Sequence, residues 1–225
     1  EMGLYAPEQS APVVIAYGHL NYHEQAVQEE IERLQNEFLA NTDYNKAPMA
    51  SWMSAFIQFV RTPGTPFYNF RNAQGYLVNP AIFYTAVNTF LTVVPAARRF
   101  RADIVFIYND ATVPPTPIGI TSSRANTFHN NLKGPIAITN SMRHAREVMS
   151  NSSLVETPRV FAAPYTRAEG FEITVREVIA YYVAVLVAVT GGTFLVVRPH
   201  SVVLSLLALV LVAMTMVNFT GNMAW

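Results

Sequence analysis

The 225-residue chain contains no cysteine. This absence excludes disulfide bonds, thiolate metal sites, iron–sulfur clusters and thiol nucleophiles from the chain. It also argues against a small secreted domain that disulfides stabilise. The sequence equally lacks a phosphate-binding loop, a dinucleotide-binding fingerprint and a nucleophile elbow. Composition and motifs therefore provide no catalytic constellation.

Histidine is also scarce, with five residues in the whole chain. His19 and His23 are four positions apart and would share one face of a helix, but a metal site needs a third and usually a fourth ligand. His144 and His200 have no neighbours in sequence that mark a haem ligand. We read these histidines as surface or interface residues, and we predict no catalytic residue, no metal site and no cofactor, with a bound phospholipid left open.

Charge is nearly absent from the C-terminal 48 residues, where Arg198 is the one charged side chain of residues 178–225. It separates two apolar runs, 178–197 and 201–217. Twenty residues of helix span about 30 Å, the thickness of a bilayer core. Because Pro199 disfavours helix, Arg198 would lie at a turn. The sequence thus predicts a two-helix transmembrane hairpin over 178–225; one long helix and a buried hairpin in a globular protein are the alternatives.

Small residues recur every four positions in the first apolar run, at Ala180, Ala184, Ala188 and Gly192. Small residues let helices approach closely, and close packing associates helices in lipid. We expect this ridge to pack on another helix, either the chain's own second span or one from another subunit. The hairpin contains no aspartate, glutamate or lysine, so an ion pathway through this chain alone is disfavoured.

Acidic and basic residues are unevenly distributed, although the net charge is zero. Residues 1–44 contain eight acids and one base, whereas residues 46–176 contain thirteen bases and six acids. We predict that Arg98, Arg99, Arg101 and Arg176 contact phospholipid head groups; salt bridges to acidic partner surfaces are the alternative. Partners are expected to be other subunits of a membrane complex and anionic phospholipids, not nucleic acid, because no basic aromatic groove motif is present.

Residues 1–177 read as a peripheral region outside the membrane, irregular and mostly helical. Apolar periodicity predicts amphipathic helices over 22–40, 48–60 and 79–95, the last lying at the membrane interface or on a partner. Residues 104–108 are β-prone. Residues 121–165 are rich in Ser, Thr, Asn, Pro and Arg, and show little periodicity. The predicted fold class is accordingly a mainly α membrane protein.

Arginines before the first apolar run favour a matrix or cytosolic N-terminal region. No signal peptide is visible. The start at Glu1 fits either a mature product of an organelle import route or a trimmed sequence. We therefore expect a non-catalytic accessory subunit of a large energy-transducing complex, such as the respiratory chain or ATP synthase, in the mitochondrial inner membrane.

Two alternatives stay open. A viral or cell-surface membrane glycoprotein would use the sequons at Asn151 and Asn218. A cofactor-binding membrane subunit would bring its cofactor to one of the histidines.

Overall fold

The computed structural model describes residues 10–130 and 132–196. The chain forms two compact units, residues 1–168 and 169–225. Its elements, in order, are β1 (Pro12–Tyr17), α1 (Gln25–Ala40), β2 (Asn45–Ser51), α2 (Trp52–Arg61), η1 (Tyr68–Phe70), α3 (Pro80–Val93), η2 (Pro95–Asp103), β3 (Ile104–Asn109), β4 (Thr116–His129), α4 (Gly134–Ser150), β5 (Arg159–Ala162) and α5 (Ala163–Val196).

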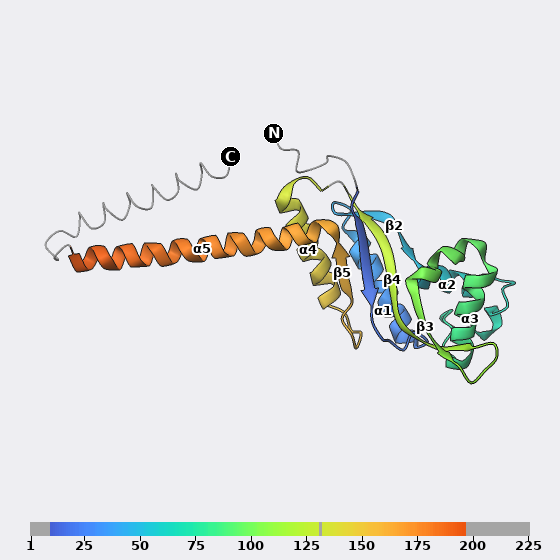
Figure 1. The fold of residues 1–225 in the computed structure, drawn as a ribbon. Helices are drawn as coiled ribbons and strands as arrows, with labels where there is room; N and C mark the ends of the chain where they lie inside the picture. The colour runs from blue at the N-terminus through green and yellow to red at the C-terminus, as the bar shows by residue number, and fades with distance from the viewer. Residues whose placement is uncertain (1–9, 131, 197–225) are drawn as a thin grey trace. The chain divides into compact units, whose positions relative to one another are not determined.

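The first unit is built on an antiparallel sheet of five strands. Four strands follow the order β2-β4-β1-β5, and β3 pairs with β4 alone. Helix α1 connects β1 to β2, and α4 connects β4 to β5, so each helix joins two strands that are separated by one other strand. This arrangement is the split βαβ pattern of ferredoxin-like folds. In Figure 1, α1 and α4 lie on the same side of the sheet.

Side chains alternate between the two faces of the sheet, as pleating requires. On the helix side, Val13 and Ile15 are fully buried. They belong to one hydrophobic core that also contains α1, α2, α3 and α4 residues. On the other side, β1 presents Pro12, Val14 and Ala16. Helices α1 and α4 therefore cover one face of the sheet, and the β1 side chains of the other face are exposed or half-buried.

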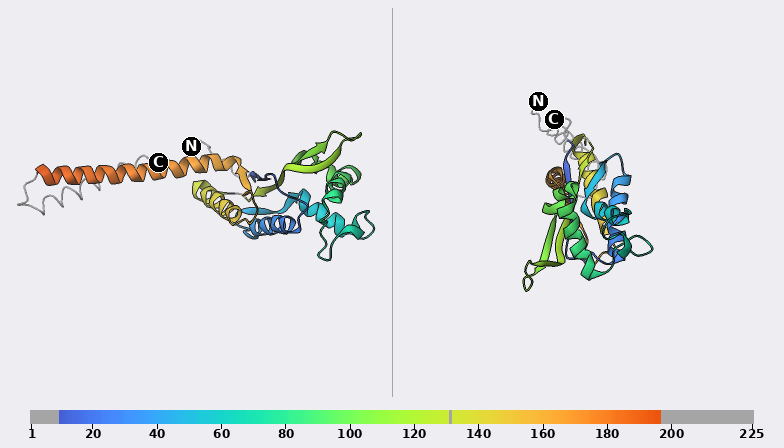
Figure 2. Two further views of the ribbon diagram at one scale, coloured as in Figure 1. Left: turned by 90° about the horizontal axis from the view of Figure 1, so that it is seen from below. Right: turned by 90° about the vertical axis from the view of Figure 1, so that its right-hand side faces the viewer.

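A long insertion separates β2 from β4. It comprises α2, η1, α3, η2 and β3. Asn79 caps α3 by accepting a hydrogen bond from the Ala81 backbone N–H, and Pro80 occupies the first turn, where its missing donor does no harm. The insertion ends in a hairpin of β3 and β4 that projects from the sheet (Figure 2). The buried residues of the insertion belong to the same hydrophobic core as those of β1 and α1.

The predicted mainly α membrane fold is wrong. The structure is an α/β fold with a five-stranded antiparallel sheet. Among the described residues, no helix combines the length and the apolar character needed to cross a bilayer. The predicted transmembrane helical hairpin over 178–225 is corrected accordingly. The integral membrane assignment and the mitochondrial inner-membrane, respiratory-chain and ATP-synthase placements depended on it and are withdrawn.

The helix that contains most of the first apolar run extends beyond it. Helix α5 spans Ala163–Val196, so it starts well before residue 178 and includes the charged Arg167, Glu169, Glu172, Arg176 and Glu177. The second apolar run, 201–217, and the Arg198 turn lie outside the described residues.

Two predicted elements differ in the first unit. The segment 48–60 was expected to be one helix, but β2 continues to Ser51 and α2 begins at Trp52. Ser51 accepts a hydrogen bond from the Ser54 backbone N–H, which caps α2 at that point. Residues 121–165, expected to be irregular, contain most of β4, all of α4 and β5.

Candidate functional site

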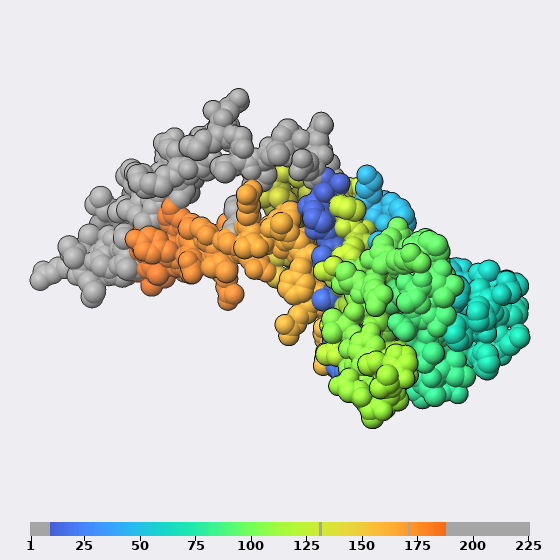
Figure 3. Space-filling model, turned by 45° about the vertical axis from the view of Figure 1, so that its right-hand side comes forward, coloured from blue at the N-terminus to red at the C-terminus, as the bar shows by residue number. Residues whose placement is uncertain are grey.

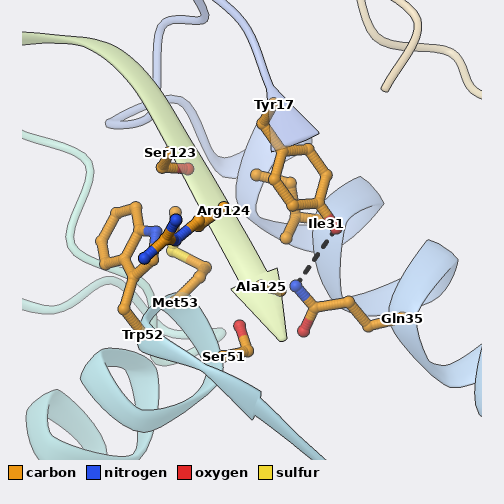
Figure 4. Close-up of a pocket in the computed structure, with 9 residues that line it drawn as sticks. All are labelled: Tyr17, Ile31, Gln35, Ser51, Trp52, Met53, Ser123, Arg124 and Ala125. Carbon is orange, nitrogen blue, oxygen red and sulfur yellow. Dashed lines mark hydrogen bonds between the residues drawn. The ribbon is translucent and has the colours of Figure 1, made fainter. Parts of the chain in front are cut away.

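A crevice lies where β1, β4, α1 and the β2–α2 junction meet (Figure 4). The Gln35 amide donates a hydrogen bond to the Tyr17 hydroxyl oxygen at 3.2 Å, and the Ser54 hydroxyl donates to Gln35 Oε1 at 3.0 Å. Burial raises the pKa of Tyr17 well above its usual value. The space between these side chains does not admit a water molecule. The crevice is thus a polar part of the core.

A second polar cluster joins the end of β4 to α4 and to the start of α5. His129 Nδ1 lies 2.9 Å from the Tyr44 carbonyl oxygen and donates to it, which leaves Nε2 as an acceptor. The Tyr165 hydroxyl donates to Nε2 at 2.7 Å, and the Ser141 hydroxyl lies 3.2 Å from the same atom. Burial lowers the pKa of His129 and raises the pKa of Tyr165 to about 12.

This cluster has the contacts of a nucleophile and base, since Ser141 neighbours a histidine whose other nitrogen is oriented by an acceptor. However, His129 and Ser141 are each 1% exposed. A substrate cannot reach the hydroxyl in this conformation. We conclude that the cluster is structural: it satisfies buried polar groups and ties three elements together.

The cluster makes stability sensitive to acid. Burial makes the pKa of His129 lower in the folded than in the unfolded chain. The contribution of neutral His129 to the free energy of unfolding is therefore fully present above about pH 6.5, and it is lost as the pH falls toward the folded pKa. Each pKa unit between the folded and the unfolded value corresponds to about 1.4 kcal/mol of stability. Chemical denaturation between pH 7.5 and about pH 5 measures this slope.

Replacement of His129 by glutamine should flatten this part of the pH profile. The matched control is His19→Gln, which replaces an exposed histidine outside the cluster. A His129→Gln variant with the same slope as the wild type would contradict the assignment.

The structure does not place His19 and His23 on a common helix. His19 and His23 both precede α1 and so do not share a helical face. His23 Nδ1 lies 3.2 Å from the Tyr84 hydroxyl. His144 packs against the Tyr44 ring, and His200 lies outside the described residues. Within residues 10–130 and 132–196, no three His, Asp or Glu side chains are placed to hold a metal ion.

The structure brings together three of the four arginines predicted to contact lipid. Arg98, Arg99 and Arg101 are exposed on η2, next to the base of the β3–β4 hairpin. Arg98 Nε donates to the Thr92 carbonyl oxygen at 3.3 Å, and the Arg99 guanidinium lies over the Phe100 ring. Arg176 is exposed on α5, in the other unit. Their lipid contacts stay a prediction.

Two further predicted features also stay untested. Ala180 and Ala184 are exposed on α5, whereas the surroundings of Ala188 and Gly192 are not described. The sequon asparagine Asn151 is exposed just after α4, and Asn218 lies outside the described residues.

The surface that stands out is the face of the sheet opposite α1 and α4, which we name the open face. Strand register places its side chains in rows, because directly paired residues point to the same side. Phe161 and Asn126 flank Val14, while Arg159 and Arg124 flank Ala16. The further members, Pro12, Phe128, Lys46 and Ala50, follow from the same register. The β1 part of this face is visible in blue in Figure 3.

The open face combines exposed apolar side chains with basic ones. Phe128 is 49% exposed and Phe161 is 55% exposed. Lys46, Arg124 and Arg159 are the charged members, and no member is acidic. Arg124 Nε donates to Asp103 Oδ1 at 2.6 Å, so one of the three charges is already paired.

Sequence reasoning missed this face, because its aromatic residues come from segments that look polar and meet only through strand pairing. The one local signal is the alternation of Arg124, Asn126 and Phe128 with buried residues in β4.

No protein-family model matches the chain. No curated protein is a significant match either. The function is therefore argued from the geometry of the open face alone.

Proposed function

We propose that this chain is a non-catalytic accessory subunit that binds a partner protein through the open face of its sheet. The observation that carries the proposal is the pair of half-exposed phenylalanines, Phe128 and Phe161, on the face of the sheet opposite α1 and α4. Exposed apolar patches with polar rims are characteristic of protein interaction sites.

The composition of the face also suits binding. Aromatic and arginine side chains are enriched in protein interfaces and contribute most of their binding free energy. The open face combines both types on a rigid scaffold, because each side chain is fixed by strand pairing rather than by a loop.

Charge favours a partner of a different kind over a second copy of the chain. A two-fold dimer would place identical patches against each other. The positive charges of Lys46 and Arg159 in one copy would then face the same positive charges in the other copy. Like charges across an interface are unfavourable. A partner with an apolar centre and an acidic rim complements the open face.

Mutation of the open face tests the proposal. Phe128→Ser and Phe161→Ser, combined in one chain, should abolish co-migration with the natural partner in native electrophoresis. Both side chains are about half exposed, so the free energy of unfolding should change by less than about 1 kcal/mol.

The matched control is Val113→Ser, which removes an apolar side chain that is 97% exposed in the β3–β4 turn. This variant should assemble as the wild type does. If the double variant is stable and still co-migrates with the partner, the open face is not the binding surface. A homodimer that persists at low protein concentration would also overturn the proposal.

A further inference from the structure

A groove of about 320 Å³ runs beside β5, between this strand and the C-terminal end of α4. Its lining residues are Arg146, Met149, Ser150, Thr157, Pro158, Arg159, Val160 and Phe161. Val160 lies on the helix side of the sheet and packs against the core, whereas Arg159 and Phe161 belong to the open face. Because residues of both faces of β5 line it, the groove follows the outer edge of the strand.

That outer edge is unpaired within the described part of the chain. Strand β5 ends the strand order and pairs only with β1, from Arg159 opposite Ala16 to Ala162 opposite Val13. An edge strand presents backbone N–H and C=O groups that an added strand can pair with. The opposite edge is less suitable, because β2 carries Lys46, Pro48 and a register shift between Lys46 and Ala50.

The groove is basic. Arg146 and Arg159 are its charged lining residues, and none of the eight lining residues is acidic. Glu156 directly precedes the lining residues 157–161, but its carboxylate lies at the β1–α1 connection, where it accepts a hydrogen bond from the His19 backbone N–H at 3.1 Å. The charge of Arg159 at the groove therefore favours an acidic segment.

We propose that the groove receives an extended acidic segment of the partner protein, which adds to the sheet as a strand beside β5. This inference rests on the proposed function and specifies the partner's chemistry. The groove shares Arg159 and Phe161 with the open face, so one partner can occupy both surfaces.

The pleat of the added strand specifies its side chains. Alternate residues would face either Arg159 and Phe161 or Val160 and Met149. The first set should pair a carboxylate with Arg159 and an apolar or aromatic side chain with Phe161, two positions apart. The second set should be apolar, because Val160 and Met149 are.

A peptide with the sequence Glu-Val-Phe-Val-Glu, blocked at both ends, presents this pattern in either strand direction. Added in excess to the full chain, it should slow amide hydrogen exchange in β5. The affinity of the charge-reversed peptide Lys-Val-Phe-Val-Lys should be lower by a factor of about five or more.

Arg159→Glu should reverse this preference, so that the lysine peptide slows exchange in β5 and the glutamate peptide does not. Arg101→Glu, which changes an exposed arginine outside the groove, should leave the preference unchanged. Reversal of preference cannot result from unfolding, because the variant must still bind one of the peptides.

Equal protection by both peptides, or none by either, would overturn the inference. So would full protection of β5 by inorganic phosphate or by vesicles containing phosphatidylserine, since these would indicate an anion site or a lipid site. If the peptides fail but the Phe128–Phe161 double variant still loses its partner, strand addition is wrong and the proposed function stands.

Discussion

Replacement of Phe56 by alanine is expected to lower the free energy of unfolding by about 3–5 kcal/mol. Phe56 is completely buried in α2. Its ring contacts Phe83 edge-to-face at a centroid distance of 5.4 Å and Phe90 at 5.8 Å, both in α3. Alanine would leave a cavity and would remove both aromatic pairs, which contribute beyond their buried area. Urea denaturation measures the loss.

The cooperativity of the unfolding transition of Phe56→Ala is a second expected result. Phe56 belongs to the inserted segment, yet it lies in the same hydrophobic cluster as β1 and α1 residues. We therefore expect a single cooperative transition that shifts as a whole. Phe70→Ala, at a side chain that is 55% exposed, should change stability by less than about 0.5 kcal/mol. A biphasic Phe56→Ala curve would show that the insertion unfolds separately.

Replacement of Glu30 by glutamine is expected to cost about 1–2 kcal/mol at pH 7. Glu30 accepts three hydrogen bonds of 2.8 Å, two from the Arg33 guanidinium and one from the Ser153 backbone N–H. Arg33 also donates to the Asn151 carbonyl oxygen at 3.2 Å. The pair thus holds the chain after α4 against α1. The expected effect is modest because Arg33 is half exposed and partly screened by solvent.

The effect of Glu30→Gln should depend on pH. The hydrogen bonds from Arg33 lower the pKa of Glu30 from 4.5 to about 2. The charged form therefore contributes stability above about pH 4.5, and this contribution is lost as the pH falls to about 2. Wild type and variant should differ at pH 7 and converge in that acidic range.

The matched control for this prediction is Glu29→Gln, an exposed neighbour on the same helix. It leaves the Arg33 contacts intact and should behave as the wild type. A constant difference between wild type and Glu30→Gln from pH 7 to pH 2 would mean that the ion pair does not carry the effect.

The sequence predicts helices best where apolar residues recur at helical spacing. Ile31, Leu34 and Phe38 share one face of α1, and all three are buried as the periodicity indicates. The stripe that includes Phe83 and Phe90 in α3 is also buried. Its surroundings were misjudged, since a stripe cannot distinguish a core from a membrane surface or a partner.

Strand β4 was missed because polar residues occupy its buried positions. Ser123, Thr127 and His129 all face the helix side and are at most 5% exposed, so the alternation of apolar and polar residues is hidden. The cost of burying these polar groups is offset by hydrogen bonds to partners distant in sequence. The Tyr22 hydroxyl accepts a hydrogen bond from Ser123, and the Lys46 carbonyl oxygen accepts one from Thr127. The open face was missed for the same reason, because it exists only once β4 is paired.

Strand β4 is shared by two parts of the first unit. Its first half pairs with β3 in the hairpin, and its second half pairs with β1 and β2. A shift of one residue along its neighbours would reverse the two faces, turning Arg124 and Phe128 inward and His129 outward. Since both halves belong to one continuous strand, such a slip would misalign the hairpin at the same time. An error of register during folding would thus disrupt the pairing of β4 with β3 as well as its pairing with β1 and β2.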